Sequence, residues 1–374
     1  MPSTYTQVAE AKDVGNSPLK NILLILALLT ILYLFFTSIG MMGSSFKLFG
    51  KGFSQALFNL VSNPFNGLLI GMMTTAIVQS SSTTTSMIVG MVGAGALNLN
   101  IAIPMIMGAN IGTSITNTIV SIGFINRSLE FKRGFAASVV HDFFNISVVI
   151  VLFPIEITFG LLEKISLWMG RMFEAVGGGH LLNPLQLITK PVINLVSNLV
   201  HHNGILLLLI ALPLLFFSLK YLTDVLKKLI IGRTEIWFQK KLFSNAIYAW
   251  TLGLVMTVMV QSSSITTSLI VPIAASGILT LPQILPYTIG ANIGTTVTAI
   301  MAALATGQIA AITTAFAHLM FNVLGAIVIW PVKFIPIRMS ELLASMAERS
   351  KYIPLVYLAL QFFIVPGLII YFTR

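Results

Sequence analysis

Two long stretches of this sequence repeat each other across the middle of the chain. The segment 71–116 aligns without a gap with the segment 253–298, and half of the aligned positions are identical. The matched positions include serines, threonines and an asparagine, which an apolar composition alone would not keep in register. A third element, 141–145, returns as 318–322. The chain is therefore an internal duplication, and we expect its two halves to fold alike.

The composition places this duplication in a membrane. Of 374 residues, 56% are hydrophobic and 9% are charged, whereas a soluble domain carries about 25% charged residues. We therefore predict an all-α integral membrane protein. The 5 His and 0 Cys exclude a disulfide framework and a thiolate metal site. The net charge of +10 lies mostly in loops between apolar segments, which favours membrane orientation over nucleic-acid binding.

The basic loops orient the two copies. The loop 220–241 carries six basic and two acidic residues, and 126–133 and 332–351 are also basic, so all three are expected in the cytoplasm. The balanced stretch 154–203 is expected outside. The copies then enter the membrane from opposite faces, as an inverted-topology repeat does, provided that each repeated polar segment is a re-entrant hairpin. We expect a multi-pass protein of the plasma (inner) membrane with a cytoplasmic N-terminus.

These patterns divide the chain into six segments. They are a polar N-terminal tail (1–20), a first transmembrane helix (21–43), repeat 1 (44–153), a linker with a connecting helix (154–225), repeat 2 (226–331), and a C-terminal segment with the last transmembrane helix (332–374).

The repeated polar segment is the first candidate site. Residues 79–86 are eight consecutive hydrogen-bonding side chains, and 261–268 match them except at Ile265. Eight helical residues cover about 12 Å and face every direction, so lipid would meet some of these groups. We therefore predict an unwound tip followed by a half-helix, whose free N–H groups and positive dipole end would suit an anion.

The repeated Gly-Ala-Asn-Ile-Gly-Thr element is the second candidate site, and we predict a broken helix there. Neutral oxygens of the kind that hard cations prefer come from Asn110, Thr113, Thr116, Asn292, Thr295 and Thr298. No acid or base lies within either motif, so a bound anion and bound cations would neutralise each other. The alternative is that these polar residues serve helix packing. Two long copies in register favour a transport site.

Two His/Asn pairs and one acid accompany the motifs. His141 and Asn145, like His318 and Asn322, are spaced to share a helix face. They either coordinate a proton or substrate or form a buried pair that braces two helices, and we favour the brace. Asp142 has no acidic counterpart and is expected to pair with Arg133 or to face water.

At these repeated motifs the sequence resembles the type II sodium–phosphate cotransporter family, in a bacterial form, over 44–153 and 226–331. The resemblance implies sodium-driven uptake of inorganic phosphate by alternating access, with the two hairpins meeting near the membrane midplane. It implies phosphate binding by Gln79, Ser80, Ser81, Ser82, Gln261, Ser262, Ser263 and Ser264. It implies sodium binding by Asn110, Thr113, Thr116, Ser262, Thr266, Asn292, Thr295 and Thr298. The loop 123–127 contains no acid, so a third sodium site and an electrogenic stoichiometry are not carried over.

The resemblance implies no enzyme activity and no cofactor other than sodium as the coupling ion. The partners expected are phosphate, sodium and the lipid bilayer, without nucleic acid, and a homodimer is left open. Three alternatives remain: a sodium-coupled carrier of sulfate or a dicarboxylate, an ion channel with hydroxyl-lined loops, and an intramembrane serine enzyme. The last is disfavoured because no base lies near either serine triplet in the sequence.

Overall fold

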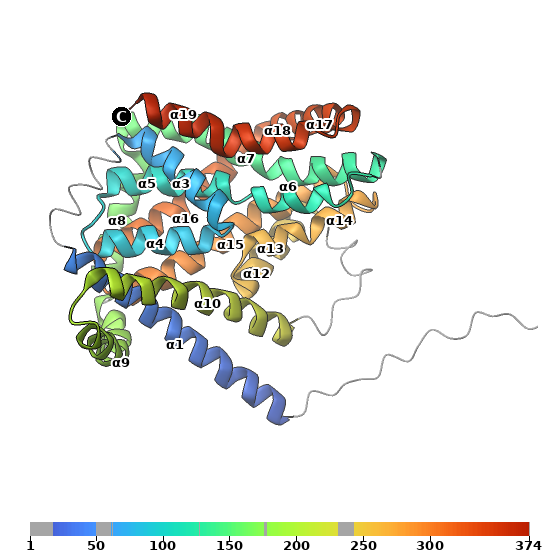
Figure 1. Ribbon diagram of the computed structural model, residues 1–374. Coiled ribbons are helices and arrows are strands. Elements are labelled where there is room, and N and C mark those ends of the chain that lie inside the picture. Colours follow the sequence, from blue (N-terminus) through green and yellow to red (C-terminus); the bar gives the residue numbers. More distant parts are fainter. Residues whose placement is uncertain are drawn as a thin grey trace, which may run out of the picture.

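The computed structural model describes residues 18–49, 61, 63–126, 128–175, 178–230 and 243–373 (Figure 1). Over these residues the chain is helical, and no β-strand is present. Most of the predicted tail 1–20 and about half of the basic loop 220–241 lie outside the described residues.

The two copies contain corresponding helices. The first copy has α3 (Pro64–Val78), α4 (Ser81–Gly93), α5 (Leu99–Gly112), α6 (Ile115–Ile122) and α7 (Ser128–Phe159). The second has α12 (Ala246–Val260), α13 (Ser263–Ser268), α14 (Ile270–Ala275), α15 (Leu281–Thr306) and α16 (Ile309–Ile329). In sequence, α13 with α14 corresponds to α4, and α15 corresponds to α5 with α6.

The remaining helices flank the repeats. α1 (Pro18–Leu48) extends beyond both predicted ends of the first transmembrane helix. The segment predicted as a linker with one helix is mostly helical, with α8 (Leu161–Ala175), α9 (Gly178–Leu199) and α10 (Gly204–Ile230). The C-terminal segment forms η1 (Trp330–Val332), α17 (Phe334–Arg349), α18 (Ile353–Ala359), the π-helical η2 (Leu360–Ile364) and α19 (Val365–Phe372).

Seven helical segments of the described chain are long and apolar enough to cross a membrane. They are Ile22–Leu48, Leu99–Ile122, Ser128–Phe159, Gly204–Leu222, Leu281–Thr306, Ile309–Val332 and Ile353–Phe372. Three further apolar helical segments have 10–17 residues. Pro64–Val78 leads into the first polar segment, Ala246–Val260 leads into the second, and Ser263–Ala275 contains and follows the second. Their length is short for a complete crossing.

Glycines bring the two helices of each copy into backbone contact. α3 packs on α5, and α12 packs on α15. A methyl group on Gly108 would overlap the carbonyl oxygen of Leu68, and one on Gly290 would overlap that of Trp250. Only glycine permits such an approach. The repeated glycines therefore form two matched helix pairs, α3–α5 and α12–α15.

The prediction of a broken helix at Gly-Ala-Asn-Ile-Gly-Thr holds in the first copy and is wrong in the second. α5 ends at Gly112 and α6 begins at Ile115, whereas α15 runs on without a break. The hydroxyl of Ser114, between α5 and α6, donates to the Asp142 carboxylate of α7. Leu319 stands at the position of Asp142 in the second copy, so nothing equivalent draws α15 away from its helical course.

The packing of the whole molecule mixes the two copies. The largest core cluster contains Phe144 from α7, Tyr287 from α15 and Phe321 from α16. α1 lies along α10 at one edge of the molecule (Figure 1). Residues of both copies therefore share one apolar core.

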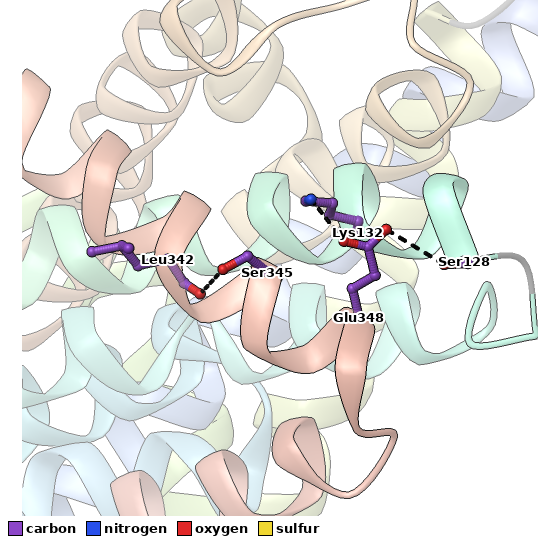
Figure 2. Close-up of polar contacts among 5 residues, drawn as sticks. All are labelled: Ser128, Lys132, Leu342, Ser345 and Glu348. Carbon is purple, nitrogen blue, oxygen red and sulfur yellow. Dashed lines mark hydrogen bonds and ion pairs between the residues drawn. The ribbon is translucent and has the colours of Figure 1, made fainter.

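An exposed polar contact joins α7 to α17 at the surface. Lys132 Nζ lies 2.7 Å from Glu348 Oε2, and Ser128 Oγ lies 3.5 Å from Glu348 Oε1 (Figure 2). The hydrogen bond from Lys132 lowers the pKa of the Glu348 carboxyl below its ordinary value. Exposed pairs of this kind stabilise a fold little, so the apolar packing of α7 and α17 carries this interface.

Candidate functional site

Each polar segment contains a two-residue break with the same backbone conformation. Gln79 has φ 55° and ψ 26°, and Gln261 has φ 56° and ψ 25°, both in the left-handed region. Ser80 and Ser262 follow in extended conformation and cap the next helix. The predicted unwound tip followed by a helix is therefore present in both copies. We call Gln79–Ser80 the first break and Gln261–Ser262 the second break.

The sequence explains this local geometry. Ser80 Oγ accepts a hydrogen bond from Thr83 N at 3.2 Å, and Ser262 Oγ accepts one from Ile265 N at 3.4 Å. Serine is a preferred N-cap residue because its hydroxyl satisfies an unpaired helical N–H. Each helix starts at its break, so its remaining first-turn N–H groups and positive dipole end point toward the break.

The hydroxyls beside the breaks are buried. The exposed fraction is 4% for Ser81 and Ser82, 2% for Ser263 and 6% for Ser264. Ser82 Oγ donates to the carbonyl oxygen of Gln261 at 3.2 Å. The structure therefore brings residues of the two polar segments, far apart in the chain, into direct contact.

The second break also contacts the second Gly-Ala-Asn-Ile-Gly-Thr region. Thr298 Oγ1 donates to Gln261 Oε1 at 2.7 Å, and Thr266 Oγ1 donates to the Ser262 carbonyl at 2.8 Å. Thr113 and Thr295 donate to carbonyls of their own helices, Ala109 at 2.9 Å and Ala291 at 3.0 Å. Their hydroxyl oxygens keep lone pairs that can coordinate a cation.

A chain of amides and an imidazole crosses between the copies. His141 Nε2 donates to Asn292 Oδ1 at 2.7 Å, and Asn292 Nδ2 donates to Asn145 Oδ1 at 2.7 Å. Asn145 Nδ2 in turn donates to the Asn110 carbonyl at 2.7 Å. All four residues are buried. His141 and Asn145 thus form a buried polar pair that braces α5, α7 and α15, as the favoured interpretation predicted. The second pair does not: Asn322 Nδ2 donates to the His318 carbonyl of its own helix, and the ring nitrogens of His318 have no hydrogen-bond partner.

Sequence reasoning missed two members of this network. Asn117 Nδ2 lies 3.4 Å from His141 Nδ1, and Thr267 Oγ1 donates to Asn117 Oδ1 at 3.0 Å. Asn117 follows Thr113 by one helical turn, but Ala299 occupies its position in the second copy. A comparison of the repeats therefore could not single it out.

The expectation that Asp142 pairs with Arg133 or faces water is wrong. Asp142 is fully buried and accepts hydrogen bonds from Ser114 and from Tyr357 Oη, the latter at 3.1 Å. Nine residues separate Arg133 from Asp142 on α7, about 13 Å along the helix axis. The Arg133 guanidinium instead lies against Gly277. The partners of Asp142 come from α18 and from the α5–α6 junction.

The two breaks and their neighbours form a neutral polar region with two complementary functions. Buried hydroxyls and first-turn N–H groups are suited to an oxyanion. Threonine hydroxyls, asparagine amides and carbonyls supply the oxygen ligands that hard cations take. Because no basic side chain is required to balance the anion, such a region suits joint binding of an anion and cations.

Comparison with known proteins gives a consistent picture. The family model described as Na+/Pi-cotransporter matches residues 34–178 and 214–331. Sodium-dependent phosphate transport protein 2A of sheep (Ovis aries) is 32% identical over 424 residues, covering 91% of this chain and 66% of the sheep protein. Protein 2B of human (Homo sapiens) is 30% identical over 441 residues, covering 91% of this chain and 64% of the human protein. These relatives are transport proteins and not enzymes.

The chain spans just under two thirds of the length of these relatives. No solved structure matches it. The comparisons thus bear on the repeats, where both candidate sites lie.

Proposed function

The chain belongs to the Na+/Pi-cotransporter family, and on that premise we propose that it is a sodium-coupled symporter of inorganic phosphate that works by alternating access. Phosphate and sodium bind between the two breaks, near the membrane midplane. The protein is a multi-pass component of the plasma (inner) membrane, with its N-terminus in the cytoplasm.

This proposal rests on the direct contact between the first turn of α4 and the second break. Ser82 Oγ lies 3.2 Å from the Gln261 carbonyl oxygen, so two helix N-termini and two serine clusters meet in one region. Phosphate presents several acceptor oxygens at once. Donors that converge from two sides can satisfy them without water, which is what an anion needs inside a membrane. Gln79 to Ser82 and Gln261 to Ser264 are the phosphate-binding residues in this proposal.

Sodium is assigned to the oxygen-rich neighbours of the breaks. The proposed ligands are Asn110, Thr113, Thr116, Ser262, Thr266, Asn292, Thr295 and Thr298. Their neutral oxygens leave the positive charge of sodium available to balance phosphate. Binding of each ion then favours binding of the other, which is the coupling a symporter requires.

The alternating-access part of the proposal is supported by the repeat itself. The helices that flank the breaks are short for a full crossing, which fits re-entrant hairpins. The distribution of basic loops favours hairpins that enter from opposite faces, and inverted repeats that hold a substrate at their interface expose it to each side in turn.

The test is uptake of radioactive phosphate into proteoliposomes that contain the purified full chain. We expect saturable accumulation driven by an inward sodium gradient and its loss when potassium or choline replaces sodium. Uptake that is absent or independent of sodium would overturn the proposal. Sodium-dependent uptake of sulfate or a dicarboxylate in preference to phosphate would change the substrate, and unitary currents without accumulation would indicate a channel.

Thr295→Ala should raise the sodium concentration needed for half-maximal uptake. The substitution removes an oxygen ligand while the helix keeps its backbone bonds, because the Thr295 hydroxyl only donates back to Ala291. Loss of one ligand of about 1.5 kcal/mol corresponds to roughly a tenfold increase. The measurement is sodium dependence at saturating phosphate, with Thr158→Ala as the matched control, because the exposed Thr158 hydroxyl likewise donates to its own helix, at the Pro154 carbonyl. An unchanged sodium requirement would remove Thr295 from the site.

A further inference from the structure

The two breaks have the same backbone but different side-chain partners. In the second copy, Thr298 Oγ1 donates to Gln261 Oε1 at 2.7 Å, and Gln261 is 7% exposed. The corresponding residues in the first copy are Thr116 and Gln79. Gln79 is exposed, and the Thr116 hydroxyl is buried without a hydrogen-bond partner. One copy makes this contact and the other does not.

The His/Asn pairs differ in the same sense. His141 of the first copy donates to Asn292 of the second at 2.7 Å. By the repeat, His318 of the second copy should meet Asn110 of the first. Instead Asn110 Nδ2 donates to its own helix at the Ile106 carbonyl, 2.9 Å away, and both ring nitrogens of His318 lack a partner although the residue is 1% exposed.

A difference in sequence between the two copies explains part of this asymmetry. Asn117 lies 3.4 Å from the second ring nitrogen of His141, whereas Ala299 stands at the equivalent position for His318. That exchange accounts for one unpartnered nitrogen of His318. The sequence does contain partners for the other nitrogen and for the Thr116 hydroxyl, namely Asn110 and Gln79. In the observed conformation these partners are not within hydrogen-bond distance.

The unpartnered groups of His318 and Thr116 both correspond to contacts with the first copy. The contacts to the side chains of Gln261 and Asn292, on the α12–α15 pair, are made. The equivalent contacts to the side chains of Gln79 and Asn110, on the α3–α5–α6 unit, are missing. Buried polar groups without partners are costly, and two that are unpartnered for the same reason indicate a second arrangement in which they are satisfied.

We propose that His318 and Thr116 are positioning residues that bond Asn110 and Gln79 in a second conformation of the protein, in which the His141–Asn292 and Thr298–Gln261 bonds are broken. His318 Nε2 donates to Asn110 Oδ1 there, and Thr116 Oγ1 donates to Gln79 Oε1. The inference rests on the proposed alternating access and names the contacts that distinguish its two end states.

The proposal predicts opposite effects for twin substitutions. His141→Leu and Thr298→Val remove bonds of the observed conformation and should shift the protein away from it. His318→Leu and Thr116→Val remove bonds of the second conformation and should shift it toward the observed one. A single buried hydrogen bond changes such a ratio by about three- to tenfold. A purely structural role would lower stability in all four variants without opposite shifts.

The sequence contains no cysteine, so a thiol reagent modifies only a cysteine that is introduced. Val78→Cys and Val260→Cys place one thiol next to each break. Val78 is partly exposed, whereas Val260 is 1% exposed. The rate of modification by a water-soluble maleimide is measured for each reporter in detergent-solubilised full-length protein without phosphate or sodium. We expect the Val78→Cys reporter to react faster than the Val260→Cys reporter.

His141→Leu should then raise the reactivity of Val260→Cys relative to Val78→Cys by about three- to tenfold, and His318→Leu should lower it by a similar factor. Asn117→Ala should act like His141→Leu, and Ser276→Ala, on an exposed turn, should change neither reporter. If His318→Leu does not accumulate, Thr116→Val tests the same prediction.

The proposal would be overturned if the His141 and His318 variants shifted the reporter ratio in the same direction. It would also be overturned if both variants folded and kept the reporter ratio of the unsubstituted protein. A Thr116→Val variant that alters the sodium dependence of uptake without shifting the reporter ratio would leave Thr116 as a sodium ligand and overturn its positioning role. Because the labelling needs neither ion, it is independent of phosphate uptake. Failed transport with opposite labelling shifts would overturn the proposed function alone.

Discussion

The double substitution Ser81→Ala with Ser263→Ala is expected to raise the phosphate concentration for half-maximal uptake by two to four orders of magnitude. The two serines occupy the same position in the two copies, and their exposed fractions are 4% and 2%. Ser82 holds the Gln261 carbonyl, and Ser80 and Ser262 cap their helices. In the proposed function, Ser81 and Ser263 donate to phosphate from opposite sides.

The size of this effect follows from the charge of the ligand. A hydrogen bond to a charged group contributes about 1.5–3 kcal/mol, which is about 10- to 100-fold in affinity for each hydroxyl. Residues at one site do not act independently, so the double variant is compared with both single variants.

The measurement is the phosphate dependence of uptake at saturating sodium. Ser345→Ala is the matched control, because the Ser345 hydroxyl donates to the Leu342 carbonyl of its own helix, α17 (Figure 2). If the double variant kept a normal phosphate dependence, the assignment of phosphate to the two breaks would be wrong.

Gly290→Ala is expected to prevent correct assembly of the second copy. A methyl group at this position would overlap the Trp250 carbonyl oxygen, and it would also lie 2.8 Å from the Trp250 carbonyl carbon and 2.9 Å from Leu254 N. These are backbone atoms, so no side chain can turn aside. Overpacking costs about 1–3 kcal/mol where side chains can move, and we expect a cost at or above the upper end of that range.

The check is the yield and thermal unfolding midpoint of the purified protein. Gly108→Ala should have the same effect in the first copy, where the methyl group would meet Leu68. Gly43→Ala is the control, because a methyl group there meets nothing within 4 Å. A Gly290→Ala protein as stable as the Gly43→Ala protein would contradict the backbone contact between α12 and α15.

Local features of the fold were predictable from local chemistry. A run of eight hydrogen-bonding side chains in a membrane segment requires a break, and the structure has one at Gln79 and one at Gln261. This prediction depends on residues that are neighbours in the sequence.

Contacts between distant helices were predicted less well. The α5–α6 interruption was expected in both copies, but it depends on Ser114 reaching Asp142, whose counterpart is Leu319. Asn117 could not be found from the repeat because Ala299 replaces it, and Tyr357 reaches Asp142 from a helix outside both copies. Such partners become neighbours only when the helices pack.

The sequence by itself determined that this chain is rich enough in apolar residues for a membrane, that it is duplicated, and that each polar segment holds an unwound tip followed by a helix. Charge content and repeat register can be counted without knowledge of the fold, and the unwound tip depends on residues close together in the chain. The tertiary structure decided which of two equivalent polar residues, one in each copy, has a hydrogen-bond partner. His141 has a partner and His318 has none, because the partner of each lies in the other copy, and the packing brings only one of these pairs together.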